Sequence, residues 1–234
     1  MENRSLSRQF TIACLWVGVL IPFFFVPMVI LAGRMTPRYG HMSSTFSDAS
    51  SQGSPHPGYM ITGLVFVSLA LGFCGFGFAH TLPRYARSIQ ISMALTAISI
   101  LMTAVLRDYN RSPWVPRNRE GMLHNTFATV AVFAILSTLF LISLAVRGNA
   151  AWTHLSIPGL AAFTIVAVAG LTFTWGPDSH DGLAERILAA AAFLYLAAVA
   201  LNALSLIRGA PLRSTLFQSV ATAQPAPAQI VFDD

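Results

Sequence analysis

Six long apolar runs dominate this chain and limit what it can fold into. A helix needs about 20 consecutive apolar residues to cross the hydrocarbon core of a bilayer. The runs cover residues 10–33, 59–80, 88–106, 125–146, 154–175 and 184–207. Only 10% of the residues are charged, whereas about a quarter are charged in soluble domains. We therefore expect an all-α, integral membrane bundle of six transmembrane helices.

The segments outside the runs set the limits of this membrane domain, which we place at residues 10–208. Residues 1–9 form a short polar head, and residues 209–234 are rich in Ala, Pro, Gln and Ser. Such a composition cannot bury a core, so we expect a mobile C-terminal tail. The first run is longer than the apolar core of a secretory signal, about 7–15 residues. We therefore expect an uncleaved first span.

Six spans place both termini on the same side of the membrane. The 14 basic residues are all arginines and divide equally between the two sides, so their number does not decide the orientation. The head carries Arg4 and Arg8, and the connectors on its side are short and basic. These features favour both termini in the cytoplasm. We expect a multi-pass protein of the cell (inner) membrane.

The ionisable side chains gather in the loops of the opposite face. One loop alone, residues 107–124, contains seven of them in a chain that is otherwise almost uncharged. The acids and histidines of this face are Asp48, Asp108, Glu120, Asp178, Asp181, Glu185, His41, His56, His124 and His180. A metal site or an acid–base site requires such a gathering at the ends of several helices. The simpler interpretation, which we prefer, is that charged residues lie in loops because the spans exclude them, and pair there.

Other sites are less well supported by the sequence. Cys14 and Cys74 form no CxxC pair, and the histidines form no HxxxH or HExxH pair, which argues against a thiolate or helical metal motif. Haem is disfavoured because the histidines lie at the ends of the spans. A divalent metal such as zinc stays open as a cofactor. Nucleic acid is not an expected partner, because the arginines are scattered between the spans.

The order of the motifs resembles a known family. The segments are STFSDASSQGSPHPGYMITGLVF after the first span, LRDYN after the third, GMLHNTFA opening the fourth and GLAERILAAAAFLYLAAVAL in the sixth. Together they resemble the bacterial membrane family catalogued as domain of unknown function 998 and, more distantly, the six-span DRAM/Frag/Sfk group. The resemblance implies architecture and no assigned activity. It marks as positions of interest Ser47, Asp48, Asp108, His124, Glu185 and Arg186.

One candidate function is a membrane-embedded hydrolase, with or without a metal ion, that acts on a lipid or its headgroup at the extracytoplasmic face. The catalytic groups would be Asp108, His124 and Glu185. The metal ligands would be Asp48, Asp108 and His124, which would have to converge within about 5 Å. The groups that bind substrate or headgroup would be Ser47, Arg107 and Arg186.

The other candidate function is a small bundle that binds membrane lipids or serves as an accessory subunit of a larger membrane-protein complex. It predicts polar groups that pair locally and either an apolar groove or a glycine-rich face in use. Gly72, Gly75 and Gly77 on the second span provide such a face. Because a catalytic site needs positive evidence, we predict this second function and leave open whether the protein is an enzyme.

Overall fold

The computed structural model describes residues 2–82, 84–107, 119–175 and 177–209, with side chains from Ser7 onward. Within these ranges every regular element is a helix, and no strand is present. The expected all-α architecture is therefore confirmed. Asp108 and residues 210–234 of the predicted tail lie outside the described residues.

Six helices are long and apolar enough to cross a membrane. They are α1 (Glu2–Met35), α3 (Gly58–Ala79), α4 (Ala86–Val105), α5 (Arg119–Ala145), α6 (Ser156–Trp175) and α7 (Asp181–Ile207). This confirms the prediction of a multi-pass membrane protein. The remaining elements are the short helix α2 (Phe46–Ser50) and two 3₁₀ turns, Thr153–Leu155 and Asp178–His180. Helix α2 lies within residues 34–58, a segment whose Ser, Gly, Pro and Thr content predicts a loop.

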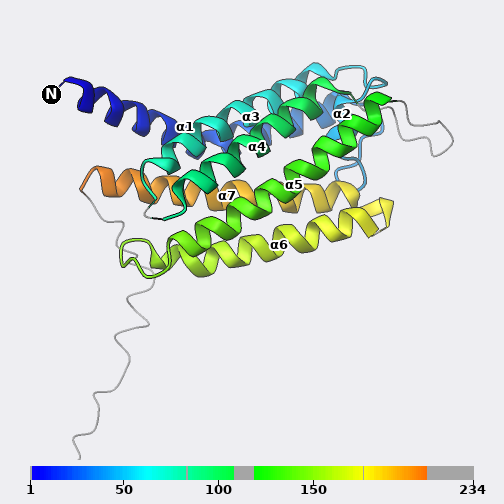
Figure 1. Ribbon diagram of the computed structural model, residues 1–234. Coiled ribbons are helices and arrows are strands. Elements are labelled where there is room, and N and C mark those ends of the chain that lie inside the picture. Colours follow the sequence, from blue (N-terminus) through cyan, green and yellow to red (C-terminus); the bar gives the residue numbers. More distant parts are fainter. Residues whose placement is uncertain (1, 83, 108–118, 176, 210–234) are drawn as a thin grey trace, which may run out of the picture.

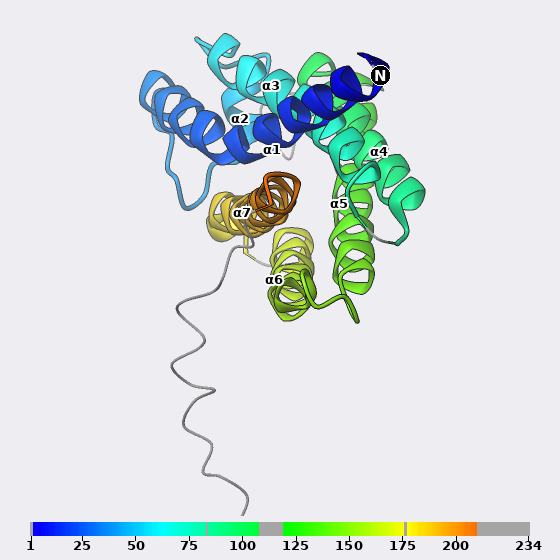
Figure 2. The ribbon, with the colours of Figure 1, turned by 90° about the vertical axis from the view of Figure 1, so that its left-hand side faces the viewer.

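The six long helices form a closed ring. Each packs against the next long helix in the chain, and α7 returns to pack against α1 (Figure 2). The core inside this ring is apolar, and its largest fully buried side chains include Phe78, Met60, Met93 and Leu139. Continuous helices satisfy their backbone groups internally, as a lipid environment requires.

Two of the three glycines of the predicted glycine-rich face are used inside this ring. A Cβ atom at Gly75 would lie 2.9 Å from Cβ of Met93 on α4, and one at Gly77 would lie 2.9 Å from Cδ2 of Leu15 on α1. Small residues allow helices to approach closely where lipid provides no hydrophobic force between them. The close approach at Gly75 and Gly77 is therefore intramolecular.

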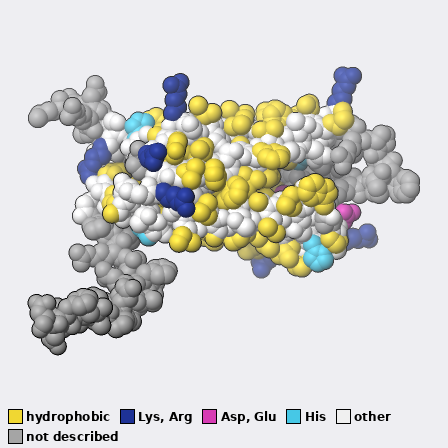
Figure 3. All heavy atoms as spheres, turned by 60° about the horizontal axis from the view of Figure 1, so that its bottom comes forward, with side chains coloured by type: hydrophobic (Ala, Val, Ile, Leu, Met, Phe, Trp, Pro, Cys, Tyr) yellow, Lys and Arg dark blue, Asp and Glu magenta, His cyan; other side chains and the backbone are white. Residues whose placement is uncertain are grey.

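The bundle has two chemically different ends. The start of α1 and the end of α7 lie together at one end, which we call the termini end, and α2 lies at the other, the α2 end (Figure 1). Between the ends, hydrophobic side chains cover the face shown in Figure 3. All acidic side chains that the structure describes belong to loops and helix ends of the α2 end. Among the side chains that the structure describes, five exposed arginines lie at the termini end: Arg8, Arg84, Arg87, Arg147 and Arg208.

Candidate functional site at the α2 end

Helix α2 begins with a capping box. The backbone N–H of Asp48 donates to Oγ1 of Thr45 (3.1 Å), and the backbone N–H of Thr45 donates to Oδ2 of Asp48 (2.7 Å). The aromatic ring of Phe46 is buried edge-on against Phe25 of α1, with 5.1 Å between ring centroids. A Thr followed three residues later by an acid is a known start signal for a helix. That signal was present in the sequence as TFSD and could have predicted α2.

Charged side chains from α7 and from the segment just after α4 complete the ends of α2. Oε2 of Glu185 accepts the backbone N–H of Phe46 at the start of α2 (2.5 Å). The guanidinium group of Arg107 donates to the backbone carbonyls of Ser50 (3.2 Å) and Ser51 (2.8 Å) at its end. A negative charge at the N-terminus and a positive charge at the C-terminus both stabilise a helix. Glu185 and Arg107 therefore hold α2 against the bundle.

Arg186 fixes the loop that leads into α2. Its Nη1 donates to the backbone carbonyls of Ser44 (3.0 Å) and Gly182 (2.5 Å), and its Nη2 donates to the hydroxyl of Tyr39 (2.6 Å). Tyr39 in turn donates to the carbonyl of Thr45 (3.2 Å). Burial raises the pKa of Tyr39 to about 12, although the positive charge of Arg186 opposes the increase. The phenol therefore stays neutral and remains a hydrogen-bond donor at physiological pH.

Glu120 connects three segments of the α2 end. Its Oε1 accepts the backbone N–H of Arg107 (2.9 Å), and its Oε2 accepts Nε2 of Gln52 (2.9 Å). These bonds join the start of α5 to the end of α4 and to the loop after α2. Neither Glu120 nor Tyr39 was among the predicted site residues. The partners of Glu120 are a backbone N–H and an amide distant in the sequence, and Tyr39 accepts from the distant Arg186, so no local pattern indicates these contacts.

Ser47 and His124 are in direct hydrogen-bond contact. Oγ of Ser47 lies 2.8 Å from Nε2 of His124, and Nδ1 of His124 lies 2.6 Å from the carbonyl oxygen of Leu106. Because a carbonyl can only accept, Nδ1 must carry a proton, and in the neutral ring Nε2 then accepts the hydroxyl of Ser47. His124 is only 2% exposed, whereas Ser47 is half-buried. The structure thus brings together two of the predicted site residues from α2 and α5.

Comparison with known proteins places the chain in a family. A family model described as "Protein of unknown function (DUF998)" matches residues 17–202. The chain belongs to the DUF998 family. The matched region runs from α1 into α7 and includes every predicted site residue of this DUF998 chain. No curated protein and no solved structure matches it.

The metal site predicted for this DUF998 chain depends on a residue outside the described ranges. Asp48 and His124 are described and Asp108 is not. Among the described residues, no group of three or more His, Cys, Asp or Glu side chains is placed to hold a metal ion. The carboxylate of Asp48 caps α2, and Nε2 of His124 faces Ser47. The catalytic role of Asp108 and the metal set stay predictions.

Proposed function

We propose that this protein binds an anionic phospholipid, with an acyl chain of the lipid in a groove between α4 and α5 and its phosphate beside the arginines of the termini end. The observation that carries the proposal is the groove itself, whose volume is about 450 Å³. This volume is within the range of roughly 300–1,000 Å³ that is usual for small-molecule sites.

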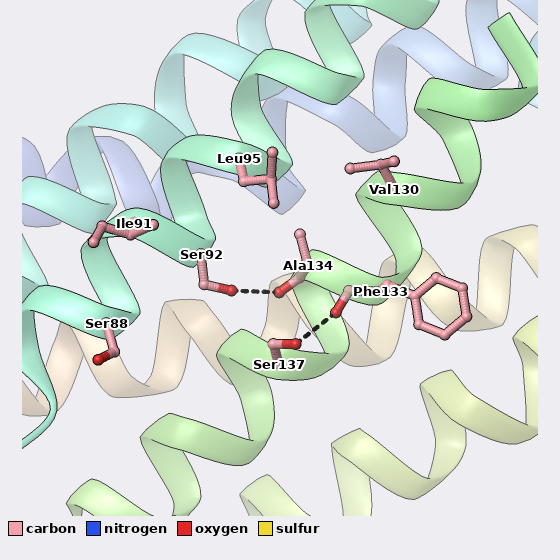
Figure 4. Close-up of a pocket in the computed structure, with 8 residues that line it drawn as sticks. All are labelled: Ser88, Ile91, Ser92, Leu95, Val130, Phe133, Ala134 and Ser137. Atoms are coloured by element: carbon pink, nitrogen blue, oxygen red, sulfur yellow. Dashed lines mark hydrogen bonds between the residues drawn. The ribbon is translucent and has the colours of Figure 1, made fainter. Parts of the chain in front are cut away.

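The groove has a buried floor and an exposed apolar rim. Ser92 and Ala134 form part of its floor, whereas Ile91 (59% exposed), Leu95 and Phe133 line its rim (Figure 4). These residues belong to membrane-spanning helices, so the surface outside the groove faces acyl chains. A lipid chain is therefore the ligand that reaches the groove without leaving the bilayer.

Of the three serines that line the groove, Ser92 and Ser137 already have hydrogen-bond partners within the protein. Oγ of Ser92 donates to the carbonyl of Ala134 (2.7 Å) and accepts from Oγ1 of Thr138 (2.9 Å). Oγ of Ser137 donates to the carbonyl of Phe133 (2.9 Å). An apolar occupant consequently leaves none of these donors unsatisfied, as burial against a hydrocarbon chain requires.

The charges near the groove favour an anionic headgroup. Ser88 lines the groove close to the start of α4, and the exposed Arg84 and Arg87 lie just before it in the chain. Arg147 follows the end of α5 at the same end of the bundle. No acidic side chain is described at this end, so phosphate would meet a positive potential without a competing carboxylate.

A second groove, between α6 and α7, is a weaker candidate. Its volume is about 360 Å³, and its mouth is lined by His180. The exposed Asp178 lies beside it in the same 3₁₀ turn. A carboxylate at this position disfavours an anionic headgroup, which is why we assign the lipid to α4 and α5.

The energetics assign most of the selectivity to the arginines. An acyl chain is surrounded by equally apolar groups in the bilayer and in the groove, so moving it into the groove gains little hydrophobic free energy. The groove therefore contributes mainly a complementary shape. Each arginine near an anionic surface contributes about 1 kcal/mol. Loss of both Arg84 and Arg87 should therefore weaken binding by about 2 kcal/mol, or roughly 30-fold. This arrangement agrees with our expectation that the termini face the cytoplasm, because anionic lipids give the cytoplasmic leaflet its negative surface potential.

The test is lipid binding measured by native mass spectrometry of the protein in detergent. We expect one phosphatidylglycerol molecule to bind in preference to phosphatidylcholine. The R84Q/R87Q variant should lose most of that preference. R119Q, which removes an exposed arginine at the α2 end, is the matched control and should retain it.

A second pair of variants tests the groove. I91W places a large side chain on the rim and should weaken binding, whereas I98W should not. Ile98 is similarly exposed, at 57%, and lies on the same helix but outside the groove. Equal binding of the two phospholipids by the parent protein, or equal effects of I91W and I98W, would contradict the proposal.

A further inference from the structure

We infer that Ser47 and His124 are a nucleophile and its general base, and that the α2 end carries out acyl transfer from a carboxylic ester at the bilayer surface. This activity goes beyond lipid binding. It also lies at the opposite end of the bundle from Arg84 and Arg87, so the two proposals do not depend on each other.

The proton positions at this pair are those that nucleophilic catalysis needs. Nδ1 of His124 donates to the carbonyl of Leu106 (2.6 Å), which leaves Nε2 as the acceptor for the hydroxyl of Ser47 (2.8 Å). A nucleophile, a base within hydrogen-bond distance and a third group that orients the base are the diagnostic features of an activated serine. Here a backbone carbonyl has the orienting role that a carboxylate has in the common triad.

Three separate elements hold the pair in place. Ser47 lies on α2, whose start is fixed by the Asp48 capping box and by Glu185, and whose end is fixed by Arg107. His124 lies on α5, and Leu106 lies at the end of α4. A five-residue helix would not persist alone in water. The surrounding hydrogen bonds therefore keep Oγ of Ser47 in a fixed position, as catalysis by proximity requires.

His124 is more deeply buried than Ser47, as expected for a protected base beside an accessible nucleophile. His124 is shielded from water, whereas Ser47 is half-buried and its segment lies beyond the ends of the membrane helices. The serine oxygen can therefore meet a substrate while its base stays protected. The headgroup level of a bilayer is where the ester bonds of lipids lie, so we assign a carboxylic ester presented at that level as the substrate class.

The reaction needs only the ester and water. Oγ of Ser47 bonds to the ester carbonyl carbon while its proton passes to Nε2 of His124. The bond between the acyl carbon and the alcohol oxygen then breaks, and the alcohol leaves with the proton from Nε2. Water attacks the acyl-serine, gives a proton to Nε2 and releases the carboxylic acid, and that proton returns to Oγ. No electron transfer is involved.

The first experiment uses a fluorophosphonate probe on the purified full chain in detergent. An activated serine displaces fluoride from such a probe and becomes covalently labelled. We expect one label per chain, and peptide mass spectrometry should locate it on Ser47. The absence of labelling in the folded protein, or a label on another serine, would overturn the inference. This readout needs no variant, so it stands even if a substitution impairs folding.

Variants then separate catalysis from structure. S47A and H124N should each reduce the labelling rate at least 100-fold. The amide nitrogen of Asn can take the place of Nδ1 and donate to the carbonyl of Leu106, so H124N removes the base and retains that structural bond. S43A removes an exposed serine from the segment just before α2. Its labelling rate should stay within twofold of the parent. Undiminished labelling of a folded H124N protein would overturn the role of His124.

Hydrolysis of p-nitrophenyl butyrate supplies the second readout. The parent should release about one equivalent of p-nitrophenol rapidly as the acyl-serine forms, and both S47A and H124N should lack this burst. The I91W and R84Q/R87Q variants should retain it, because they alter the termini half of the bundle. Failure of the acyl-transfer inference is thereby distinguishable from failure of the lipid-binding proposal.

Discussion

Two arginines of the α2 end, Arg107 and Arg186, have different surroundings from three arginines of the termini end. At the α2 end, the guanidinium groups of Arg107 and Arg186 bind backbone carbonyls of the loops around α2. At the termini end, Arg84, Arg87 and Arg147 are exposed, and no described carboxylate accompanies them. Buried backbone carbonyls require donors, and the long irregular segment around α2 has many of them. The first group of arginines therefore stabilises the fold, and the second group is accessible to ligands.

This difference predicts that replacing Arg by Gln costs much more stability at the α2 end than at the termini end. R186Q should reduce the free energy of unfolding by about 2–3 kcal/mol, because a charged donor loses three hydrogen bonds. The loss is moderated because Nε of Arg186 has no hydrogen-bond partner in the described structure. Unfolding in mixed detergent micelles measures the change. R87Q is the control and should change stability by less than about 0.5 kcal/mol. Equal destabilisation by R87Q would remove the distinction between the ends.

Close packing at the α2 end provides a second test. A Cβ atom at Gly182 would overlap the carbonyl oxygen of Ser44 and lie 2.8 Å from Nη1 of Arg186. The backbone of Ser44 and the hydrogen-bonded guanidinium of Arg186 cannot move away easily. G182A should therefore lower the free energy of unfolding by about 2 kcal/mol. Gly58 has no atom within 4 Å of the equivalent position, so G58A is the matched control. A G182A protein as stable as the parent would mean that the loop around Ser44 moves freely.

The same contrast explains what the sequence could predict. The six spans follow from local composition, because apolar runs of sufficient length determine where a chain crosses a membrane. The gathering of acids and histidines at one end follows from the spans and their connectivity. The start signal TFSD indicates where α2 begins, but it does not indicate that a five-residue helix persists, because two of its main supports, Arg107 and Glu185, are distant in the sequence.

The pairing of individual atoms was beyond sequence reasoning. Ser47 and His124 were both marked as site residues, but nothing local indicates that Oγ of one faces Nε2 of the other across 77 positions. The binding of a headgroup by Arg107 and Arg186 stays a prediction. Their guanidinium groups contact backbone oxygens and, for Arg186, the hydroxyl of Tyr39, and the positions of these partners depend on how the loops fold. Residue type and end of the bundle were predictable, whereas the partner of each side chain was not.

The smallest effect that we predict concerns pH and Tyr39 at the α2 end. Its pKa is about 12 in the folded protein because of burial, and about 10 in an unfolded chain. Folding thus favours the protonated phenol, so its contribution to stability is fully present below pH 10 and is lost as the pH rises through 12. Because part of the ring is exposed and solvent screens the charge, we expect a loss of only about 1 kcal/mol.

The measurement is the unfolding free energy of the parent and of Y39F at pH 9 and at pH 11.5. Y39F lacks the titrating hydroxyl and the bonds to Arg186 and Thr45, so it should be less stable at pH 9 but should lose less on going to pH 11.5. The difference between the two slopes isolates Tyr39 from every other group that titrates in this range. Identical slopes would mean that the phenol is hydrated in the folded protein, which would leave the contact between Arg186 and the loop before α2 weaker than its hydrogen bonds indicate.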